Sequence, residues 1–399
     1  MKSSKQRIVA IDYFRGLCIL IVLLSHSYKF SMPFSYLSGQ GKLWTSAAEM
    51  FFLLSGITFG IVRGPKIASD FKVVMRKSWR RAGGIYLLHI GLVCYAILLG
   101  FFCISHNLTY LDAQSLPTIT GVPLLTSIIS FHFPIGLADF LMYYAIYLLI
   151  APFALYALRT RVWFLIPLTS VFIYSLSTFL PYGNFAQWQF YFFAGLTLAR
   201  FRQPIITTIY SLPPALYRAF YRTVTMAALI TIIIGSLLAF PLSPYVNKLV
   251  IGGWLPAKFS AAYLRLISHQ NGIDTWLQNG RAGALRPAAT LVVLLAFYLF
   301  YQKHKDFLLK YSGRVVNKFG RDTLYVYIAQ AVAIPLIIAL PLHYGGLAIN
   351  LLATLAFFYA MWLVVQRRAI WAATSAYLEG LKQSYNQSKN NYLQNYEDG

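Results

Sequence analysis

Arg15 and His26 are the two residues whose types and spacing point most directly to chemistry. They lie eleven residues apart in an apolar run. On an α-helix this spacing places them within about 20° of one face and about 16 Å apart along the axis. A guanidinium can hold an anion, and an imidazole can take a proton from a hydroxyl. Asp12, three residues before Arg15, can pair with it on the same helix.

The composition requires a membrane around this helix. Hydrophobic residues make up 58% of the chain and charged residues 11%, against about 45–50% and about 25% in soluble domains. Ionisable residues inside a membrane helix are costly and usually belong to a pathway or a reaction centre. We therefore expect an all-α polytopic membrane helix bundle over residues 1–370, with a polar tail over residues 371–399.

Apolar stretches of about 17–25 residues predict about ten transmembrane helices. They lie near residues 8–28, 44–62, 83–104, 135–157, 162–180, 186–201, 223–241, 285–302, 321–341 and 346–366. The apolar segment 117–131 is too short to span and is interpreted as a re-entrant or interfacial piece. We find no internal repeat, which weakens a transporter built from two inverted halves.

Charge bias orients these spans. With the N-terminus in the cytoplasm, 26 of the 34 Lys and Arg residues fall on the inner side, and the external loop 105–134 contains none. This bias predicts that both termini are cytoplasmic. A bacterial inner (plasma) membrane location is what the family resemblance given below implies. The net charge of +23 then faces anionic lipid, so no nucleic-acid partner is expected.

Three titratable residues fall at the predicted outer level. His26 ends the first span, Glu49 begins the second and Asp139 begins the fourth. A histidine with carboxylates at its depth can serve as a general base with an orienting partner. The plain alternative is a helix-end histidine bonded to a carbonyl or to water.

Basic residues gather at the predicted inner level. Arg76, Arg80 and Arg81 lie at the inner end of the third span. Together with Arg15 they could hold the phosphates of a nucleotide-bearing donor, or they could simply anchor the helix on the positive-inside rule. The sequence has no phosphate-cradling glycine loop, and its seven histidines show no metal-ligand spacing. We therefore expect neither a metal nor a bound cofactor.

Other polar residues have both a structural and a functional interpretation. Ser55 precedes Gly56 in a helix, where small residues commonly allow close packing. Trp188 opens the sixth span, where an interfacial tryptophan is expected. Gln330 lies at mid-depth in the ninth span, where an amide needs a partner.

Several motifs resemble the acyltransferase-3 superfamily of integral membrane O-acyltransferases. They are Asp12-x-x-Arg15-Gly16, Arg15-x10-His26, Glu49-x-Phe51-Phe52-x-Leu54-Ser55-Gly56 and the Arg76/Arg80/Arg81 cluster. Further fragments are most similar to the OpgC branch, the succinyltransferases of osmoregulated periplasmic glucans. They are Ala138-Asp139 running to Tyr143 and Ala151-Pro152, Trp188-Gln189 with Phe193-x-Gly195, Leu285-Arg286-Pro287, and Gly320-Arg321-Asp322-x-Leu324.

The resemblance implies a ten-helix bundle that moves an acyl group from cytosolic acyl-CoA, as co-substrate, to a hydroxyl of a glycan on the outer face. It implies that His26 is the catalytic base, Glu49 its partner and Arg15 a donor-binding residue. Superfamily members often carry a histidine where this chain has Gln330, which argues against a second catalytic histidine there. The succinyl group is implied by the branch alone.

We therefore predict a membrane O-acyltransferase acting on a glycan or glycolipid. The sequence leaves open whether the protein forms a homo-oligomer. The candidate catalytic residues are His26, Glu49 and Asp139. The candidate donor-binding residues are Arg15, Asp12, Ser55, Arg76, Arg80, Arg81 and Tyr325. The candidate acceptor-binding residues are Trp188, Gln189 and Trp254. One alternative is a secondary transporter or flippase for an anionic sugar, and another is a scaffold subunit of a glycan export complex.

Overall fold

The computed structural model describes residues 9–27, 43–108, 121–129, 137–177, 183–239, 285–340 and 348–368, with single residues 30, 38, 179, 261, 283 and 346. Within these ranges the regular elements are helices and no strand is present. The prediction of an all-α polytopic bundle is therefore confirmed. Residues 371–399 and Trp254 lie outside the described residues.

The first helices are α1 (Val9–His26), α2 (Ala47–Ile67), α3 (Phe71–Ser105), α4 (Val122–Ile129), α5 (Asp139–Ala157), α6 (Leu165–Leu176), α7 (Gly183–Tyr210) and α8 (Pro214–Ala239). They are followed by α12 (Arg286–Leu308), the π-helical turn η3 (Leu309–Gly313), α13 (Arg314–Arg321), α14 (Thr323–Ala339) and a last helix, Ala348–Arg368.

A helix occupies each of the ten predicted ranges, but not all of them are full spans. Within the described residues, six helices are long and apolar enough to cross a membrane, or seven if α12–α13 and α14 form one bent span. The helix α6, predicted at residues 162–180, has only 12 residues. The segment 117–131 contains α4, an eight-residue helix, as expected of a piece too short to span.

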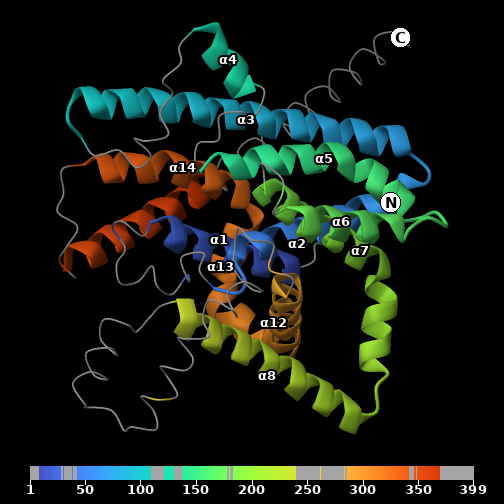
Figure 1. Cartoon of the computed structure of the whole chain (residues 1–399). Coiled ribbons are helices and arrows are strands. Elements are labelled where there is room, and N and C mark those ends of the chain that lie inside the picture. Colours follow the sequence, from blue (N-terminus) through green and yellow to red (C-terminus); the bar gives the residue numbers. More distant parts are fainter. Residues whose placement is uncertain are drawn as a thin grey trace, which may run out of the picture.

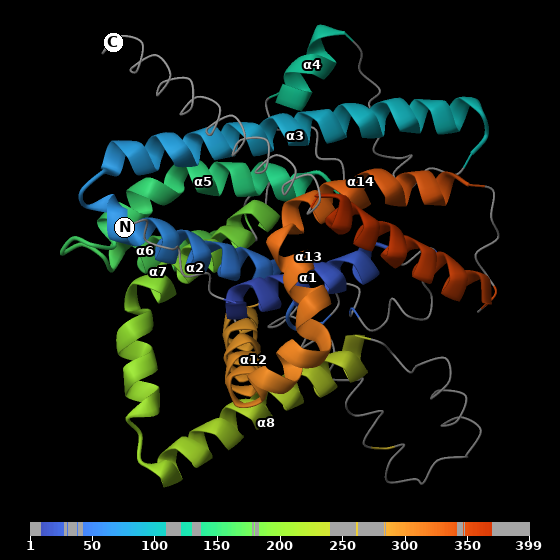
Figure 2. The same ribbon diagram turned by 180° about the vertical axis from the view of Figure 1, so that it is seen from behind.

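Most helices pack into one bundle. The pairs α2–α7, α3–α5 and α1–α13 make its main contacts, and α3 runs beside α5 along one side of it (Figure 1). The helix α8 lies apart from this bundle and packs against α12, an arrangement that is also visible from behind (Figure 2). The second half of α7, which contains Pro204, turns away from the bundle toward α8 (Figure 1). Proline is a common cause of such a bend.

Two pairs of glycines bring helix backbones into contact. A Cβ atom on Gly56 of α2 would lie 2.0 Å from the Phe192 carbonyl oxygen of α7, and one on Gly195 would lie 2.1 Å from the Leu53 oxygen. Small residues permit this approach because they remove side-chain bulk between the helices. The interpretation of Gly56 as a close-packing position is therefore confirmed.

The second glycine pair joins α1 to α13. A Cβ atom on Gly16 would lie 2.0 Å from the Val316 carbonyl oxygen, and one on Gly320 would lie 1.7 Å from the Asp12 oxygen. Directly after Gly320 and Arg321 the chain bends by 78°, so that α14 begins at Thr323. The contact therefore holds the start of α14 beside the middle of α1.

The glycine contact of α2 predicts a measurable difference between two substitutions in one helix. Gly56→Ala should lower the free energy of unfolding by about 1–3 kcal/mol, because α2 and α7 must separate. Gly64→Ala is the control, since no atom lies within 4 Å of its Cβ position, and it should be neutral or slightly stabilising. Thermal unfolding in detergent, followed by tryptophan fluorescence, measures both. Equal unfolding temperatures would contradict the prediction.

Candidate active site

A small cavity of about 70 Å³ lies among α1, α2, α3 and α5. It is lined by three arginines together with hydroxyl, apolar and aromatic side chains. They are Arg15, Ser55, Thr58, Phe59, Val62, Arg63, Arg81 and Tyr144. No acidic side chain is among them. We call this cavity the guanidinium pocket.

Arg15 reaches the guanidinium pocket from the middle of α1. One terminal nitrogen of Arg15 donates a hydrogen bond of 2.8 Å to the Thr323 hydroxyl, and the guanidinium lies 5.3 Å from the centre of the Phe51 ring. The Arg15 Nε atom is buried and has no hydrogen-bond partner within the described part of the chain. Since Thr323 is the first residue of α14, Arg15 lies beside a helix N-terminus, where the backbone also favours an anion.

The lining of the pocket collects positive charge and contains no acidic side chain, although Asp12 lies close to Arg15. Arg81 lies with its guanidinium 5.8 Å from the Tyr144 ring centre, close enough to Arg15 to repel it. The Ser55 hydroxyl is buried and also lacks a partner among the described residues. Guanidinium forks and a hydroxyl are suited to an anion with several oxygens, such as a phosphate or carboxylate.

The structure brings together only part of the predicted donor-binding set. Arg15, Ser55 and Arg81 line the pocket, whereas the exposed Arg76 and Arg80 of α3 do not. Arg63 also lines the pocket, although it is not among the predicted site residues. A signal for Arg63 was available in the helical periodicity, because Arg63 lies eight residues after Ser55 and about 80° from it around α2, within one broad helix stripe.

Asp12 and Tyr325, the other two predicted donor-binding residues, do not line the pocket. Asp12 forms an ion pair of 3.9 Å with Arg321, although it remains close enough to Arg15 to interact with it electrostatically. The Tyr325 ring lies 3.2 Å from the guanidinium carbon of Arg368. Tyr325 therefore has a partner on the last helix.

His26 forms the other end of the same helical face. Its ring lies 6.4 Å from that of Tyr327 in an edge-on arrangement. Gln330, one turn further along α14, is the polar side chain that interacts with the imidazole, although both amide atoms of Gln330 and the His26 Nδ1 atom are buried outside hydrogen-bond geometry. Gln330 was noticed in the sequence as an amide needing a partner and was not counted as a site residue.

Asp139 lies near the histidine through Tyr327. Asp139 is close enough to Tyr327 to interact electrostatically, and the Tyr327 hydroxyl donates a hydrogen bond of 2.7 Å to the Leu137 carbonyl oxygen. His26 and Asp139, which were predicted at one depth, thus share Tyr327 of α14 as a neighbour.

Glu49 has a different partner from the one predicted. Its carboxylate is buried and forms an ion pair with Arg286 at the start of α12. Its second oxygen accepts hydrogen bonds of 3.0 Å from the Ser46 backbone and 3.0 Å from the Thr290 hydroxyl. Among the described residues no hydrogen bond joins Glu49 to His26. Both carboxylate oxygens are therefore engaged at the joint between α2 and α12, and the pairing of Glu49 with His26 stays a prediction.

The two predicted acceptor residues at the start of α7 differ in their surroundings. Trp188 is half-buried and packs against aromatic rings of α2 and α5, with ring centres 5.4 Å from Phe52 and 6.0 Å from Phe140. The Gln189 amide is buried and engaged by Ser170 of α6, through hydrogen bonds of 2.8 and 3.0 Å. Gln189 therefore joins α6 to α7 in this structure, and Trp188 keeps an exposed edge.

Metal ligation finds no support in this region. Within the described part of the chain, no group of three or more His, Cys, Asp or Glu side chains could hold a metal ion.

The fold defines a polytopic helical membrane protein with an arginine-lined pocket beside α1. A family model described as OpgC protein matches residues 7–373, so the chain belongs to the OpgC family. Membership supports modification of a glucan by an acyltransferase-like membrane protein. The comparison with curated proteins gave no match, and neither did the comparison with solved structures.

The Glu49–Arg286 pair predicts a stability effect. Glu49→Gln should lower the free energy of unfolding by about 3–5 kcal/mol, because Arg286 is left buried without its counter-charge. Replacing both residues with Met should restore most of that loss, since the pair is removed together. Denaturation in detergent measures all three proteins. If the Glu49→Gln protein is as stable as the unchanged chain but turns over slowly, Glu49 takes part in the reaction and the stability prediction is wrong.

Proposed function

We propose that this protein is an acyl-CoA-dependent O-acyltransferase of the acyltransferase-3 superfamily. It transfers an acyl group, succinyl by analogy with the OpgC branch, from the cytoplasm to a glycan hydroxyl on the outer face. The observation that carries the proposal is the guanidinium pocket at one end of the α1 face, with a buried imidazole at the other end, in an OpgC-family chain.

The donor is proposed to enter at the guanidinium pocket. Arg15, Arg63 and Arg81 supply three positive charges for its phosphates, and the start of α14 adds backbone donors. The small volume of the pocket, about 70 Å³, suits one phosphate group and not the whole nucleotide. The pantetheine arm then extends along α1 toward His26, a rise of about 16 Å for eleven residues.

His26 is proposed to act as the general base. Its imidazole takes the proton of the acceptor hydroxyl while the oxygen attacks the thioester carbonyl carbon. The C–O bond forms, the C–S bond breaks, and the imidazolium returns the proton to the thiolate, which leaves as free thiol. Gln330, which interacts with the ring, is proposed to hold its orientation in place of Glu49.

The acceptor is proposed to bind at half-buried Trp188, which packs on a cluster of largely buried aromatic rings. The rings of Phe52, Phe140 and Tyr143 lie 5.4–6.0 Å from Trp188, and Phe140 stacks at 5.0 Å on Tyr327. The aromatic cluster thus continues to the Tyr327 ring, which lies next to His26. Asp139 stays a proposed contributor there through its proximity to Tyr327.

One observation favours the transporter alternative. The break between α13 and α14 bends the chain by 78° beside Arg15, and broken helices are typical of transporter binding sites. The two functions differ in what they consume. Purified protein given acyl-CoA and a glucan acceptor releases free thiol if it is an acyltransferase, and a transporter or flippase releases none.

Replacement of His26 tests the chemistry. His26→Ala should lower thiol release by about 10²–10⁴-fold, because the hydroxyl proton has no acceptor, while binding of acyl-CoA should be unchanged. The matched control is His106→Ala, at the exposed end of α3, which should keep full turnover. The assay is thiol release by the purified, folded variants. Undiminished turnover of His26→Ala would remove the catalytic assignment.

Replacement of the pocket arginines tests donor binding. Arg15→Ala or Arg63→Ala should weaken acyl-CoA binding by about tenfold to a hundredfold, the range expected from loss of one charge-assisted hydrogen bond. Arg15→Lys should restore only part of it, because the fork geometry is lost. Isothermal titration measures the affinity. Arg76→Ala, outside the pocket, should change little, and an equal loss there would indicate diffuse surface attraction instead of a site.

A further inference from the structure

A second, larger cavity lies away from the residues proposed for catalysis. It has a volume of about 530 Å³ and is formed where the end of α7, the start of α8 and the end of α12 meet. Aromatic hydroxyls, one amide and three cations line it. They are Tyr210, Tyr217, Arg218, Tyr221, Arg222, Gln302 and Lys303. None of these residues lines the guanidinium pocket.

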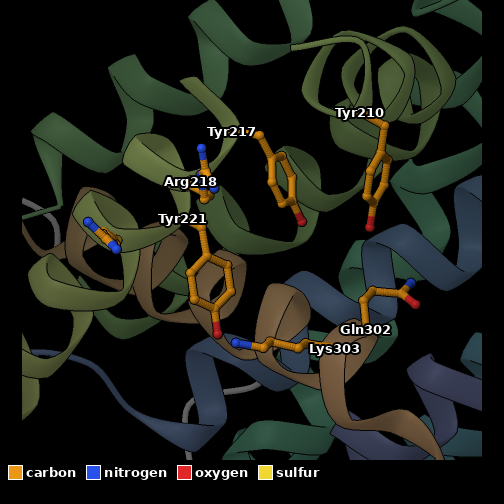
Figure 3. Close-up of a pocket in the computed structure, with 7 residues that line it drawn as sticks. Tyr210, Tyr217, Arg218, Tyr221, Gln302 and Lys303 are labelled. Carbon is orange, nitrogen blue, oxygen red and sulfur yellow. The ribbon is translucent and has the colours of Figure 1, made fainter. Parts of the chain in front are cut away.

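The cavity combines apolar aromatic walls with a few polar side-chain tips. The Tyr210 and Tyr217 rings stack with centres 6.0 Å apart. Figure 3 shows their hydroxyls turned toward the same open space as the Gln302 amide. Lys303 reaches the opposite wall, where its Nζ atom lies 5.3 Å from the Tyr221 ring centre. The helix α12 departs from regular geometry directly after this lysine, at His304, with φ −118° and ψ 19°.

Three positive charges line the cavity, and no acidic side chain in the lining balances them. No acidic side chain lines it, and the ion pairs found among the described residues do not include Arg218, Arg222 or Lys303. Arg218 and Arg222 are four residues apart on α8, a spacing at which like charges destabilise a helix by a few tenths of a kcal/mol. An anion with several oxygens removes this repulsion and accepts from the hydroxyl, amide and guanidinium donors together.

The position of the cavity identifies the source of such an anion. Charge bias places residues 200–222 and 303–321 on the cytoplasmic side, and tyrosines gather at the membrane–water boundary. Basic pockets between helices at this level bind the headgroups of anionic lipids. The helix α8 also has little protein around it, since 11% of its spanning window is buried, against 61% for α5. A headgroup between α7, α8 and α12 supplies contacts that the protein alone does not.

We propose that this cavity binds a phosphate ester, supplied by the headgroup of an anionic phospholipid of the inner leaflet. The bound headgroup holds α8 against α12 and is separate from the transfer reaction. The same phosphate chemistry occurs at the nucleotide end of acyl-CoA, so the experiment must separate the two sources.

The test compares two triple variants of the full chain. Arg218→Gln, Arg222→Gln and Lys303→Gln remove the cavity charges. Arg202→Gln, Lys305→Gln and Arg314→Gln remove as many exposed charges from α7, α12 and α13 outside it. The proteins are purified in detergent and titrated with phosphatidylglycerol, and bound lipid is counted by native mass spectrometry. We expect at least a tenfold weaker affinity in the cavity variant and an unchanged affinity in the control.

A parallel titration uses adenosine 3′,5′-bisphosphate as the nucleotide probe. If this probe binds and its binding is lost only in the cavity variant, the phosphate ester belongs to the acyl donor. This result would overturn the proposal that a lipid supplies it. If both triple variants bind phosphatidylglycerol as the unchanged protein does, the site itself is refuted. Lys303→Gln alone provides a milder variant should the triple variant fail to fold, and we expect it to weaken lipid binding severalfold.

Discussion

The backbone contact between Gly16 and Gly320 controls where both polar ends of α1 find their neighbours. Because no side chain separates the helices there, α13 crosses α1 directly beside Arg15. The chain then bends, and α14 begins at Thr323, which accepts a hydrogen bond from Arg15. From that start α14 runs along α1, so that Gln330 reaches His26 two turns later. A single close approach thus sets the surroundings of a guanidinium and of an imidazole.

The helix α2 completes the guanidinium pocket because it is held at two points. Gly56 lets its backbone touch α7, and the buried ion pair of Glu49 with Arg286 ties its first turn to α12. A buried pair of this kind contributes little net stability, yet losing one partner is costly. Its effect is therefore to fix position. Ser55 and Arg63 are presented to Arg15 because α2 can neither rotate nor slide between these two attachments.

Hydropathy and helical periodicity predicted the helices and one face of the site. The ten apolar ranges each contain a helix, and the eleven-residue spacing from Arg15 to His26 holds within α1. Depth alone did not predict partners. Glu49 shares a predicted level with His26, but its partner Arg286 lies 237 residues further along the chain, and no periodic signal links them. The short length of α6 was not predicted, because apolar turn residues before Leu165 lengthened its hydrophobic run.

The two ends of the α1 face share a physical property that explains why they matter. The Arg15 Nε atom and the Ser55 hydroxyl at one end, and the His26 Nδ1 and Gln330 amide at the other, are buried without hydrogen-bond partners in the described part of the chain. Each such group costs about 1–3 kcal/mol. A buried group without a partner needs an explanation, such as an ordered water, an ion or a bound substrate. We interpret both ends as surfaces completed by substrate, a cationic end by an anion and a neutral end by a hydroxyl. Since they are about 16 Å apart, only a substrate with a long, flexible arm can complete both at once.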